Sequence, residues 1–353
     1  MYAHDATPIR IGALQRHATD WLAESDLRLF TPGPATGKRV AVVGGGPAGL
    51  AAARDLALLG HAVTIFEARS QLGGLNTYGI VPFRLPVDVA LWEARQVVEL
   101  GVEVRAGVHV GDDVAPAALL EEFDAIVLAP GMGDVPRLGI PGEDLDGVED
   151  ALDIIERAKF ARPLSLGSSV AVIGAGNTAI DAATVARRLG AEDVTMWYRR
   201  GPEQMTAYGF EVAFARAEGV AFRFGRVPIR IEGERGAVSA IVFARSEIGP
   251  DGVPAPVPGT EERVAVTSVI RAIGQAKRSA LFAAFGVAAD RGVPIVDRAM
   301  RTSDPRVYAA GDCIFTPGSR DAMVVVAAQQ GKEVAANVDR ALRDAPQQAM
   351  RHG

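Results

Sequence analysis

Residues 40–49 read VAVVGGGPAG, and this stretch predicts how the chain begins to fold. The apolar, β-branched run at 40–43 is typical of a buried parallel strand, and residues 50–59 are rich in Ala and Leu, as in a helix. Between them stand three glycines at GxGxxG spacing: Gly44, Gly46 and Gly49. Such a strand, turn and helix place backbone N–H groups and the positive end of a helix where a pyrophosphate binds.

A second strand and an acidic residue follow this turn. The run AVTIF at 62–66 is expected to be the next strand, and Glu67 stands at its end. Glu67 follows Gly49 at close to the spacing of about 20 residues at which a carboxylate reaches a ribose. A glycine turn beside a surface glutamate in any βα unit would look similar. The agreement of strand, turn, helix, strand and acid favours a dinucleotide site.

The same pattern returns in the second half of the chain. Residues 169–179 read SVAVIGAGNTA, which predicts a strand and a Gly-rich turn, and a helix is expected at 179–189. The small residues stand at GxGxxA spacing: Gly174, Gly176 and Ala179. The following strand, at 193–198, ends in Arg199 and Arg200 rather than in an acid. Two dinucleotide folds in one chain suggest that it holds two dinucleotides.

The two strand ends differ in a way that indicates which cofactor each motif takes. Glu67 suits the ribose hydroxyls of an adenosine, whereas the guanidinium groups of Arg199 and Arg200 suit a phosphate, which they bind in a forked geometry. We therefore expect FAD at the first motif and NADPH at the second. Arginine pairs also border NADH sites, and a solvated basic turn would carry the same residues, so the second cofactor stays open at this point.

The C-terminal part of the chain carries further candidate flavin contacts. Gly311-Asp312 follows a short strand at 307–310, where an acid can accept a hydrogen bond from the ribityl chain of a flavin. A helix expected at 321–342 would begin near Met323 and direct its positive end at the flavin ring. An ordinary helix N-cap is the alternative role for this aspartate, but the presence of the first motif favours the flavin.

Composition limits the classes of protein to which the chain can belong. Its 353 residues are enough for two domains, and an apolar content of 48% is that of a globular protein. A net charge of −6 argues against general binding to nucleic acid or to an anionic membrane. The N-terminus lacks a signal-peptide core and no apolar run reaches about 18 residues, so we expect a cytoplasmic protein without a membrane span.

Cysteine and histidine content narrows the redox chemistry. Cys313 is the single cysteine, so we expect no disulfide, no CxxC pair and no iron–sulfur cluster, which takes about four thiolates. The five histidines show no metal-ligand spacing, and we expect no metal site and no catalytic side chain. Hydride exchange between a nicotinamide and a flavin fits this inventory, because it needs stacked rings rather than an acid or a base.

The remaining elements are predicted from periodicity and from the positions of glycine and proline. An arm at 1–37 is expected to hold a short helix at 9–26, and residues 71–86 are expected to form an ordered loop. The other expected elements are a helix at 87–100 and strands at 102–110, 123–129, 222–248 and 264–273.

In their order, these motifs resemble the flavoprotein reductase family of the glutamate synthase small (β) subunit. That family includes the N-terminal reductase part of dihydropyrimidine dehydrogenase and its bacterial split subunit, and adrenodoxin reductase is a more distant relative. The resemblance covers nearly the whole chain. It rests on the arm at 9–21, YGIVPFRLP at 78–86, IPGE at 140–143, GAGNTAID at 174–181, YRR at 198–200, AIG at 272–274 and AAGDC at 309–313.

The resemblance implies an α/β fold with two Rossmann-like dinucleotide-binding domains of the glutathione and adrenodoxin reductase type. In such a fold the NAD(P) domain is inserted into the FAD domain. The expected division is an N-terminal arm at 1–37, the first part of the FAD-binding domain at 38–139, the NAD(P)-binding domain at 140–275 and the second part of the FAD-binding domain at 276–353.

The family motifs, carried over position by position, predict both cofactor sites. The FAD candidates are Gly44, Gly46, Pro47, Ala48, Gly49, Glu67, Ala68, Arg69, Gly74, Leu75, Arg84, Val108, Ala129, Pro130, Gly131, Gly311, Asp312, Met323 and Val324. The candidates for NADPH or NADH are Gly174, Gly176, Asn177, Thr178, Arg199, Arg200, Ala272 and Gly274. The sequence APG at 129–131 replaces the family's ATG, and its proline removes a backbone donor beside the expected flavin.

The resemblance also predicts a partner. Members of the family usually begin with a cysteine-rich domain that holds two iron–sulfur clusters, whereas this sequence begins at the arm that follows it. We therefore expect an FAD-containing reductase subunit that exchanges electrons between NAD(P)H and a separate ferredoxin-like, iron–sulfur subunit. A further catalytic subunit would make the hetero-oligomer a glutamate synthase, a pyrimidine dehydrogenase or an aldehyde or acyl-CoA oxidoreductase.

Two alternatives stay open at this point. One is a free-standing NADPH–ferredoxin reductase of the adrenodoxin reductase type. The other is an assembly subunit in which the flavin is structural, and Pro130 gives it slight support. The direction of electron flow is open as well.

Overall fold

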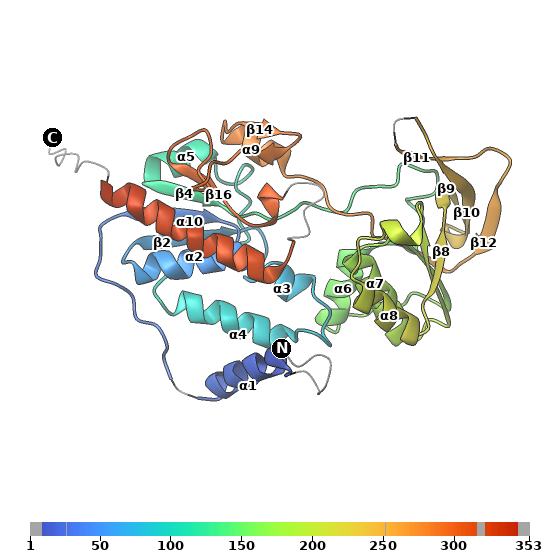
Figure 1. Cartoon of the computed structure of the whole chain (residues 1–353), viewed down its shortest axis with the longest axis horizontal. Helices are drawn as coiled ribbons and strands as arrows, with labels where there is room; N and C mark the ends of the chain where they lie inside the picture. The colour runs from blue at the N-terminus through green and yellow to red at the C-terminus, as the bar shows by residue number, and fades with distance from the viewer. Residues whose placement is uncertain (1–8, 26, 251, 316–321, 345–353) are drawn as a thin grey trace.

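The computed structural model describes residues 9–25, 27–250, 252–315 and 322–344, so the first eight residues of the expected arm lie outside the described residues. Figure 1 shows two lobes that are connected by two crossing segments of the chain. The first lobe holds strands β1–β4 and β16, and the second lobe holds strands β5–β13. Among the described residues, no helix is long and apolar enough to cross a membrane.

Five parallel strands form the sheet of the first lobe. In sheet order they are β16 (Val307–Ala309), β4 (Ala125–Leu128), β1 (Arg39–Val43), β2 (Ala62–Glu67) and β3 (Glu103–Ala106). Apart from β3 they are almost wholly buried, because helices cover both faces of the sheet. One face packs against α2 (Pro47–Leu58), α4 (Val87–Val98) and α10 (Val324–Asp344), and the other against α5 (Pro116–Glu122) and α9 (Ser279–Ala284) (Figure 1).

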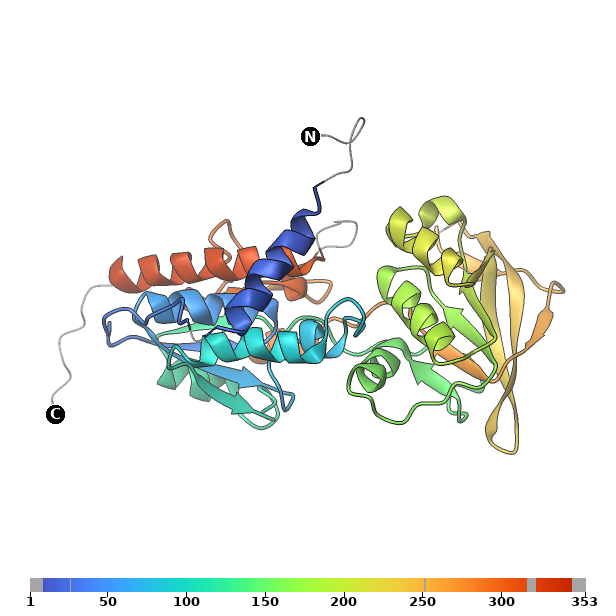
Figure 2. The ribbon, with the colours of Figure 1, turned by 90° about the horizontal axis from the view of Figure 1, so that it is seen from below.

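The second lobe repeats this plan with one difference. Its parallel sheet runs in the order β5 (Val148–Asp150), β13 (Ser268–Arg271), β6 (Ser169–Ile173), β7 (Asp193–Tyr198) and β8 (Ala221–Phe224). One face is covered by α6 (Ala151–Lys159), α7 (Asn177–Arg188) and α8 (Gly209–Ala217). The other is covered by an antiparallel sheet of β9 (Arg226–Glu234), β10 (Ala237–Ile248), β11 (Pro254–Pro256) and β12 (Glu262–Ala265), at the end of the molecule away from the first lobe (Figure 2).

Smaller elements complete the described chain. Helix α1 (Ile11–Ala23) lies beside α4 in both views (Figures 1 and 2). The others are α3 (Leu75–Tyr78), the 3-10 turns η1 (Pro202–Gln204) and η2 (Asp312–Ile314), and the hairpin of β14 (Ala289–Asp290) and β15 (Val293–Pro294).

Both glycine turns and both parallel sheets lie where the sequence predicts them, which confirms the α/β class with two Rossmann-like units. The prediction of one strand at 264–273 is wrong, because β12 pairs with β10 while β13 pairs with β6, so the chain changes sheet between them. The loop predicted at 71–86 contains helix α3. The sequence analysis does not predict α5, α6, α8 and α9, which are short and are stabilised mainly by packing on a sheet. The helix expected at 321–342 begins at Val324, and Asp321 lies outside the described residues.

Gly331 lets helix α10 lie directly on α2. A Cβ at this position would stand 2.2 Å from the carbonyl oxygen of Ala48 and 2.8 Å from the Cβ of Ala51. The two helix backbones are therefore closer than any larger residue would allow. Because α2 starts at the first glycine turn, this contact packs α10 against the helix that follows the turn.

We expect Gly331→Ala to destabilise the protein. The added methyl group would overlap the backbone of α2, and overpacking of this kind costs about 1–3 kcal/mol. Urea denaturation measures the free energy of unfolding. Gly12→Ala is the matched control, since a Cβ there would have no atom of the described residues within 4 Å and Ala favours helix α1. An unfolding free energy equal to that of the wild type for Gly331→Ala would contradict the packing argument.

Candidate dinucleotide-binding sites

The first glycine turn joins β1 to α2 and is held by close backbone contacts. Gly44 has a φ of +102°, and a Cβ there would lie 2.3 Å from the carbonyl oxygen of Ala129, just after β4. A Cβ on Gly49 would lie 1.9 Å from the carbonyl oxygen of Gly44. These two glycines are therefore required by the turn and by the packing of the helix on the strand.

Gly46 faces open space instead. Among the described residues, chain neighbours aside, the one atom within 4 Å of a Cβ at this position is the Cα of Gly74, at 3.8 Å. Gly74 has a φ of +53°, and a Cβ on it would lie 2.8 Å from the Cα of Gly46. No side chain of the described residues caps the N-terminus of α2. These two bare backbones and the uncapped helix end form a cradle that fits the pyrophosphate of FAD.

Glu67 lies at the end of β2 beside this cradle, with 8% of its surface exposed. One carboxylate oxygen accepts from the Gly45 N–H at 2.7 Å and the other from the Arg69 N–H at 2.8 Å. Each oxygen keeps a lone pair, so the carboxylate is oriented and can still accept from ribose hydroxyls.

Gly45 is a residue of this site that the motif treats as variable. A Cβ there would lie 2.4 Å from Cδ2 of Leu72 and 3.2 Å from Oε2 of Glu67. Because Gly45 has no side chain, it leaves room for the carboxylate of Glu67, which accepts a hydrogen bond from this turn. The unbroken GGG run at 44–46 was the signal in the sequence that could have found it.

Other predicted FAD residues come to the same edge of the first sheet. Val108 donates its N–H to a carbonyl at the end of β2 at 3.0 Å. The Cα of Pro130 would lie 2.9 Å from a Cβ on Gly44, so the APG segment contacts the glycine turn. A Cβ on Gly311 would lie 2.9 Å from the Cβ of Ala48. Segments from several parts of the chain thus meet near the glycine turn, and their contacts with FAD stay a prediction.

The contacts predicted for the flavin ring are partly described. Burial raises the pKa of the Asp312 carboxyl, and the nearby Lys277 opposes this rise. Met323 and Val324, at the start of α10, are each 41% exposed. Residues 316–321, which connect η2 to α10, lie outside the described residues. The approach of this helix end to a flavin therefore stays a prediction.

Arg84 is a predicted FAD residue whose side chain reaches the second lobe. Both terminal nitrogens donate to the carboxylate of Glu211 on α8, and Nη2 lies 3.3 Å from Oδ1 of Asp181 on α7. Arg84 therefore bridges the segment at 71–86 to two helices beside the second glycine turn. Its contact with a flavin stays a prediction.

This bridge contains two carboxylates, those of Asp181 and Glu211, but one guanidinium group, that of Arg84. Asp181 approaches Arg84 outside hydrogen-bond geometry, and its Oδ1 is buried without a donor among the described residues. Burial raises the pKa of Asp181 to about 6. The positive charge of Arg84 lowers this pKa, and the negative charge of Glu211 raises it further. The folded protein therefore carries an unfavourable buried charge whenever Asp181 is ionised.

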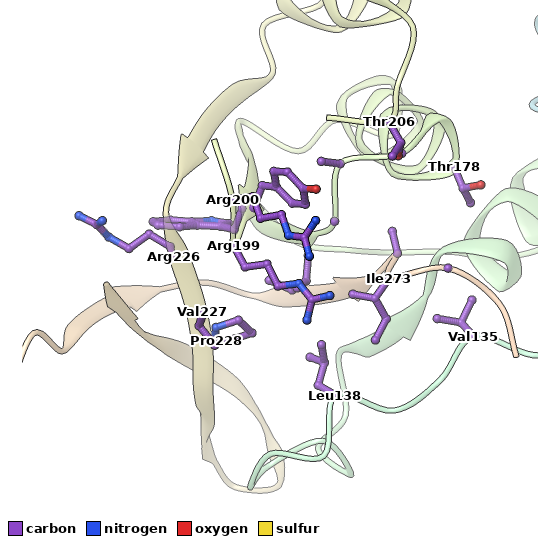
Figure 3. Close-up of a pocket in the computed structure, with 18 of the residues that line it drawn as sticks. Val135, Leu138, Thr178, Arg199, Arg200, Thr206, Arg226, Val227, Pro228 and Ile273 are labelled. Carbon is purple, nitrogen blue, oxygen red and sulfur yellow. The ribbon is translucent and has the colours of Figure 1, made fainter. Parts of the chain in front are cut away.

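A cavity of about 500 Å³ opens beside the second glycine turn (Figure 3). The predicted NAD(P) residues that line it are Gly174, Gly176, Thr178, Arg199, Arg200, Ala272 and Gly274. Asn177 does not line it; its Oδ1 accepts from the Tyr208 N–H at 3.1 Å. The lining residues that sequence reasoning missed include Val135, Leu138, Thr206, Arg226 and Val227, which come from other segments and carry no local motif. It also missed Trp197, which lies on β7 directly before the YRR motif.

Arg199 and Arg200 leave the end of β7 and extend to the same side of the cavity (Figure 3). Within the described part of the chain neither has an ion-pair partner, and Nε of Arg200 is buried without a hydrogen-bond acceptor. Arg226, on β9, points away from the pair and contacts Glu262 at 3.2 Å. Two unpaired guanidinium groups at the end of the second strand fit an anion such as the 2′-phosphate of NADPH.

Comparison with known proteins agrees with this geometry. The sequence profile of the pyridine nucleotide-disulphide oxidoreductase family matches residues 38–331. The chain belongs to this family. As a member it is an NAD(P)H-dependent oxidoreductase that binds FAD, in line with the two sites just described.

Individual members of this family confirm the resemblance seen in the sequence. The glutamate synthase [NADPH] small chain of Escherichia coli is 34% identical over 352 residues, which cover 93% of this chain and 74% of the relative. The beta subunit of the NADP(+)-dependent formate dehydrogenase of Moorella thermoacetica is 39% identical over 321 residues, or 87% of this chain and 44% of the relative. This chain thus spans less than half the length of the latter protein.

Two solved structures share the fold. FprA of Mycobacterium tuberculosis, in complex with NADPH, has a TM-score of 0.67 at 22% identity and covers 89% of this chain and 85% of its own. Thioredoxin reductase of T. acidophilum has a TM-score of 0.68 at 22% identity, with coverage of 86% and 98%. The expected glutathione reductase-like architecture of two dinucleotide-binding units is therefore confirmed.

We expect Gly46→Ala to weaken FAD binding without weakening the fold. The backbone of Gly46, with φ −76° and ψ −175°, is accessible to alanine, and the new methyl group would point into the cradle. We expect a loss of FAD affinity of about tenfold or more, which corresponds to about 1.4 kcal/mol. Titration of the apoprotein by flavin fluorescence measures the affinity, and thermal denaturation of the apoprotein should show no change.

Gly209→Ala is the matched control for this variant. Gly209 lies on α8, far from the cradle, and a Cβ there would have no atom of the described residues within 4 Å. Normal FAD affinity in Gly46→Ala would argue against the cradle.

Asp181→Asn should stabilise the protein at about pH 8. The folded state binds the Asp181 proton more tightly than the unfolded chain does, so the contribution of this group to stability is fully present below about pH 4 and is lost as the pH rises through about 6. The variant lacks this fall and should gain roughly 1–3 kcal/mol over the wild type at about pH 8, and little at about pH 4. Urea denaturation at both pH values measures the difference, and a difference independent of pH would contradict the burial argument.

Proposed function

We propose that this chain is the flavin-bearing reductase subunit of a multi-subunit oxidoreductase. In that enzyme it exchanges electrons between NADPH and an iron–sulfur partner on another polypeptide. The observation that carries the proposal is the pairing of two dinucleotide sites with a single, buried cysteine. When FAD is bound, it supplies the chemistry that links a two-electron nicotinamide to a one-electron acceptor.

Cys313 supports an acceptor outside this chain. Its thiol is 2% exposed, and burial raises its pKa to about 12, so it stays protonated and unreactive. Among the described residues, no group of three or more His, Cys, Asp or Glu is placed to hold a metal ion. The single cysteine rules out a dithiol within this sequence, and the described residues offer no metal centre as the next electron acceptor of the flavin.

The names of the relatives support the same assembly. They are the beta subunit of a formate dehydrogenase, the beta subunit of an NADPH-Fe(3+) oxidoreductase and the small chain of a glutamate synthase. Each is named as one subunit of a larger enzyme. We extend this subunit role to the present chain, in a cytoplasmic complex whose final substrate binds to another subunit. Glutamate synthase, pyrimidine dehydrogenase and aldehyde or acyl-CoA oxidoreductase are the candidate types.

Each site would then have its own task. The cradle of Gly46 and Gly74 would hold the FAD pyrophosphate, and Glu67 would hold the ribose of its adenosine. Arg199 and Arg200 would hold the 2′-phosphate of the nicotinamide cofactor, so the proposal favours NADPH over NADH.

Two measurements test the proposal. When the FAD-loaded chain is mixed anaerobically with NADPH, the flavin absorbance should bleach; no bleaching with either NADPH or NADH would overturn the proposal. A native pull-down with metal analysis should find iron in the complex and none in the isolated chain. A chain that is isolated alone and reduces added ferredoxin would favour the free-standing reductase. A complex whose flavin is not reduced by either nucleotide would favour the structural flavin.

We expect Arg200→Ala to raise the KM for NADPH and to leave the KM for NADH close to its wild-type value. Hydrogen bonds to a charged group contribute about 1.5–3 kcal/mol, which corresponds to a rise of about tenfold to a hundredfold. Steady-state kinetics with ferricyanide as acceptor measure both constants. Arg263→Ala is the matched control, since it removes one positive charge from a surface pair with Glu232 in the same lobe. Equal rises for both nucleotides would contradict a phosphate contact.

A further inference from the structure

Lys159 is a buried lysine of the second lobe whose hydrogen bonds cross to the first lobe. It is the last residue of α6, and 5% of its surface is exposed. Its Nζ donates to the carbonyl oxygen of Asn76 at 2.5 Å and to that of Ile80 at 2.8 Å. Both carbonyls belong to the segment at 71–86, where α3 lies beside α6 at the junction of the lobes (Figure 1).

Lys159 completes the hydrogen bonding of α3. This helix has a single turn, far below the length at which an isolated helix is stable in water. The amides of Gly79 and Ile80 both donate to the carbonyl of Leu75, at 2.8 Å each. In a longer helix the Ile80 amide would pair with the carbonyl of Asn76, and here Lys159 donates to that carbonyl instead.

The other end of α3 is part of the FAD cradle. Gly74 is the N-cap of this helix, and a Cβ on it would lie 2.8 Å from the Cα of Gly46. The N–H of Gly73 donates to the carbonyl of Gly45 in the glycine turn at 2.7 Å. The four residues of α3 therefore lie between the cradle and Lys159, and a movement at one end is transmitted to the other.

The second lobe fixes the position of Lys159. Ile154 and Ile155, on the same helix, are fully buried in the core of that lobe. Burial lowers the pKa of Lys159 to about 8, and no carboxylate of the described residues opposes this shift. The two carbonyls of the 71–86 segment are therefore the groups that hold its ammonium, and breaking these bonds is costly at a buried site. Helix α6 is thus the anchored element, and α3 is the element that it positions.

We propose that Lys159 is a positioning residue for FAD, which holds α3 so that Gly74 stays in the pyrophosphate cradle. The FAD site of the first lobe then depends on a side chain of the lobe that binds the nicotinamide cofactor. This inference rests on the proposed function, in which the cradle holds FAD.

Lys159→Met removes the ammonium and keeps an unbranched side chain of similar length. Titration of the apoprotein with FAD, followed by flavin fluorescence at about pH 7, measures the Kd for FAD. Because hydrogen bonds to a charged group are lost, we expect this Kd to rise about tenfold or more. The Kd of the FAD-loaded protein for NADP⁺, from isothermal titration, should change less than about twofold. Lys332→Met, on the exposed surface of α10, also removes one positive charge and should alter neither constant.

A double-mutant cycle tests whether Lys159 acts through Gly74. Gly74→Ala disturbs the cradle directly, because Gly74 has a φ of +53° and the new methyl group would overlap Gly46. Effects of independent residues on the Kd for FAD multiply to within about twofold. If Lys159 acts through Gly74, the Kd of the double variant should lie at least about threefold below the product of the two single effects.

Hydrogen exchange of the wild-type chain tests the same link without a variant. FAD in the cradle fixes Gly74, so it should also stabilise the far end of α3 and its contact with Lys159. We expect FAD to slow the exchange of the Tyr78 and Gly79 amides and of the last turn of α6 by about threefold or more. This measurement decides the question even if Lys159→Met does not fold.

The possible outcomes separate this inference from the proposed function. Wild-type FAD affinity in Lys159→Met would overturn it, as would a double variant whose Kd equals the product of the single effects. An equal loss of FAD and NADP⁺ affinity would also overturn it, because Lys159 would then support the fold in general. Exchange at the end of α6 that does not respond to FAD would overturn it as well. A wild-type chain that binds no FAD would instead contradict the proposed function.

Discussion

The contact between the carbonyl oxygen of Gly44 and the backbone of Gly49 is the constraint on which the first lobe depends. A Cβ on Gly49 would stand 1.9 Å from that oxygen, so only a bare backbone lets α2 begin directly over the end of β1. Gly331 then brings α10 onto α2 in the same way. Strand, turn and two helices form one closely packed block, and the open cradle at Gly46 lies at its edge.

The glycine turn of the second lobe also brings a helix over the end of a strand, but its third position is less closely packed. A Cβ on Gly174 would lie 2.2 Å from the carbonyl oxygen of Ala272, as Gly44 does against Ala129 in the first lobe. The third position of the turn is Ala179, which is fully buried, so this helix leaves room for a methyl group. The two turns therefore share their first glycine for the same steric reason. The residues that distinguish one nucleotide from another lie beyond the turns, at the ends of the second strands.

The segment at 71–86 connects the two sites physically. Lys159, on α6 of the second lobe, donates to the carbonyls of Asn76 and Ile80 at 2.5 and 2.8 Å, and burial lowers its pKa to about 8. Tyr78 packs against Phe160, with ring centroids 5.6 Å apart. Together with the Arg84 bridge, these contacts place the flavin-side segment against helices of the nicotinamide lobe. The relative position of the two proposed cofactor sites therefore depends on polar groups that are buried at this junction.

The sequence by itself determined the two glycine turns, the strands and helices that flank them, and the acid and arginines at the ends of the second strands. These features depend on φ angles, close approaches and periodicity within about 30 residues, which one βαβ unit contains. Only the tertiary structure decided that Arg84 pairs with Glu211, 127 residues away, that Phe243 holds Trp197, and that the segment at 264–273 divides between two sheets. Such contacts join segments whose local sequences carry no mark of their partners. The wall of the cavity is built from such segments, because the topology of the fold determines which parts of the chain lie beside the glycine turn.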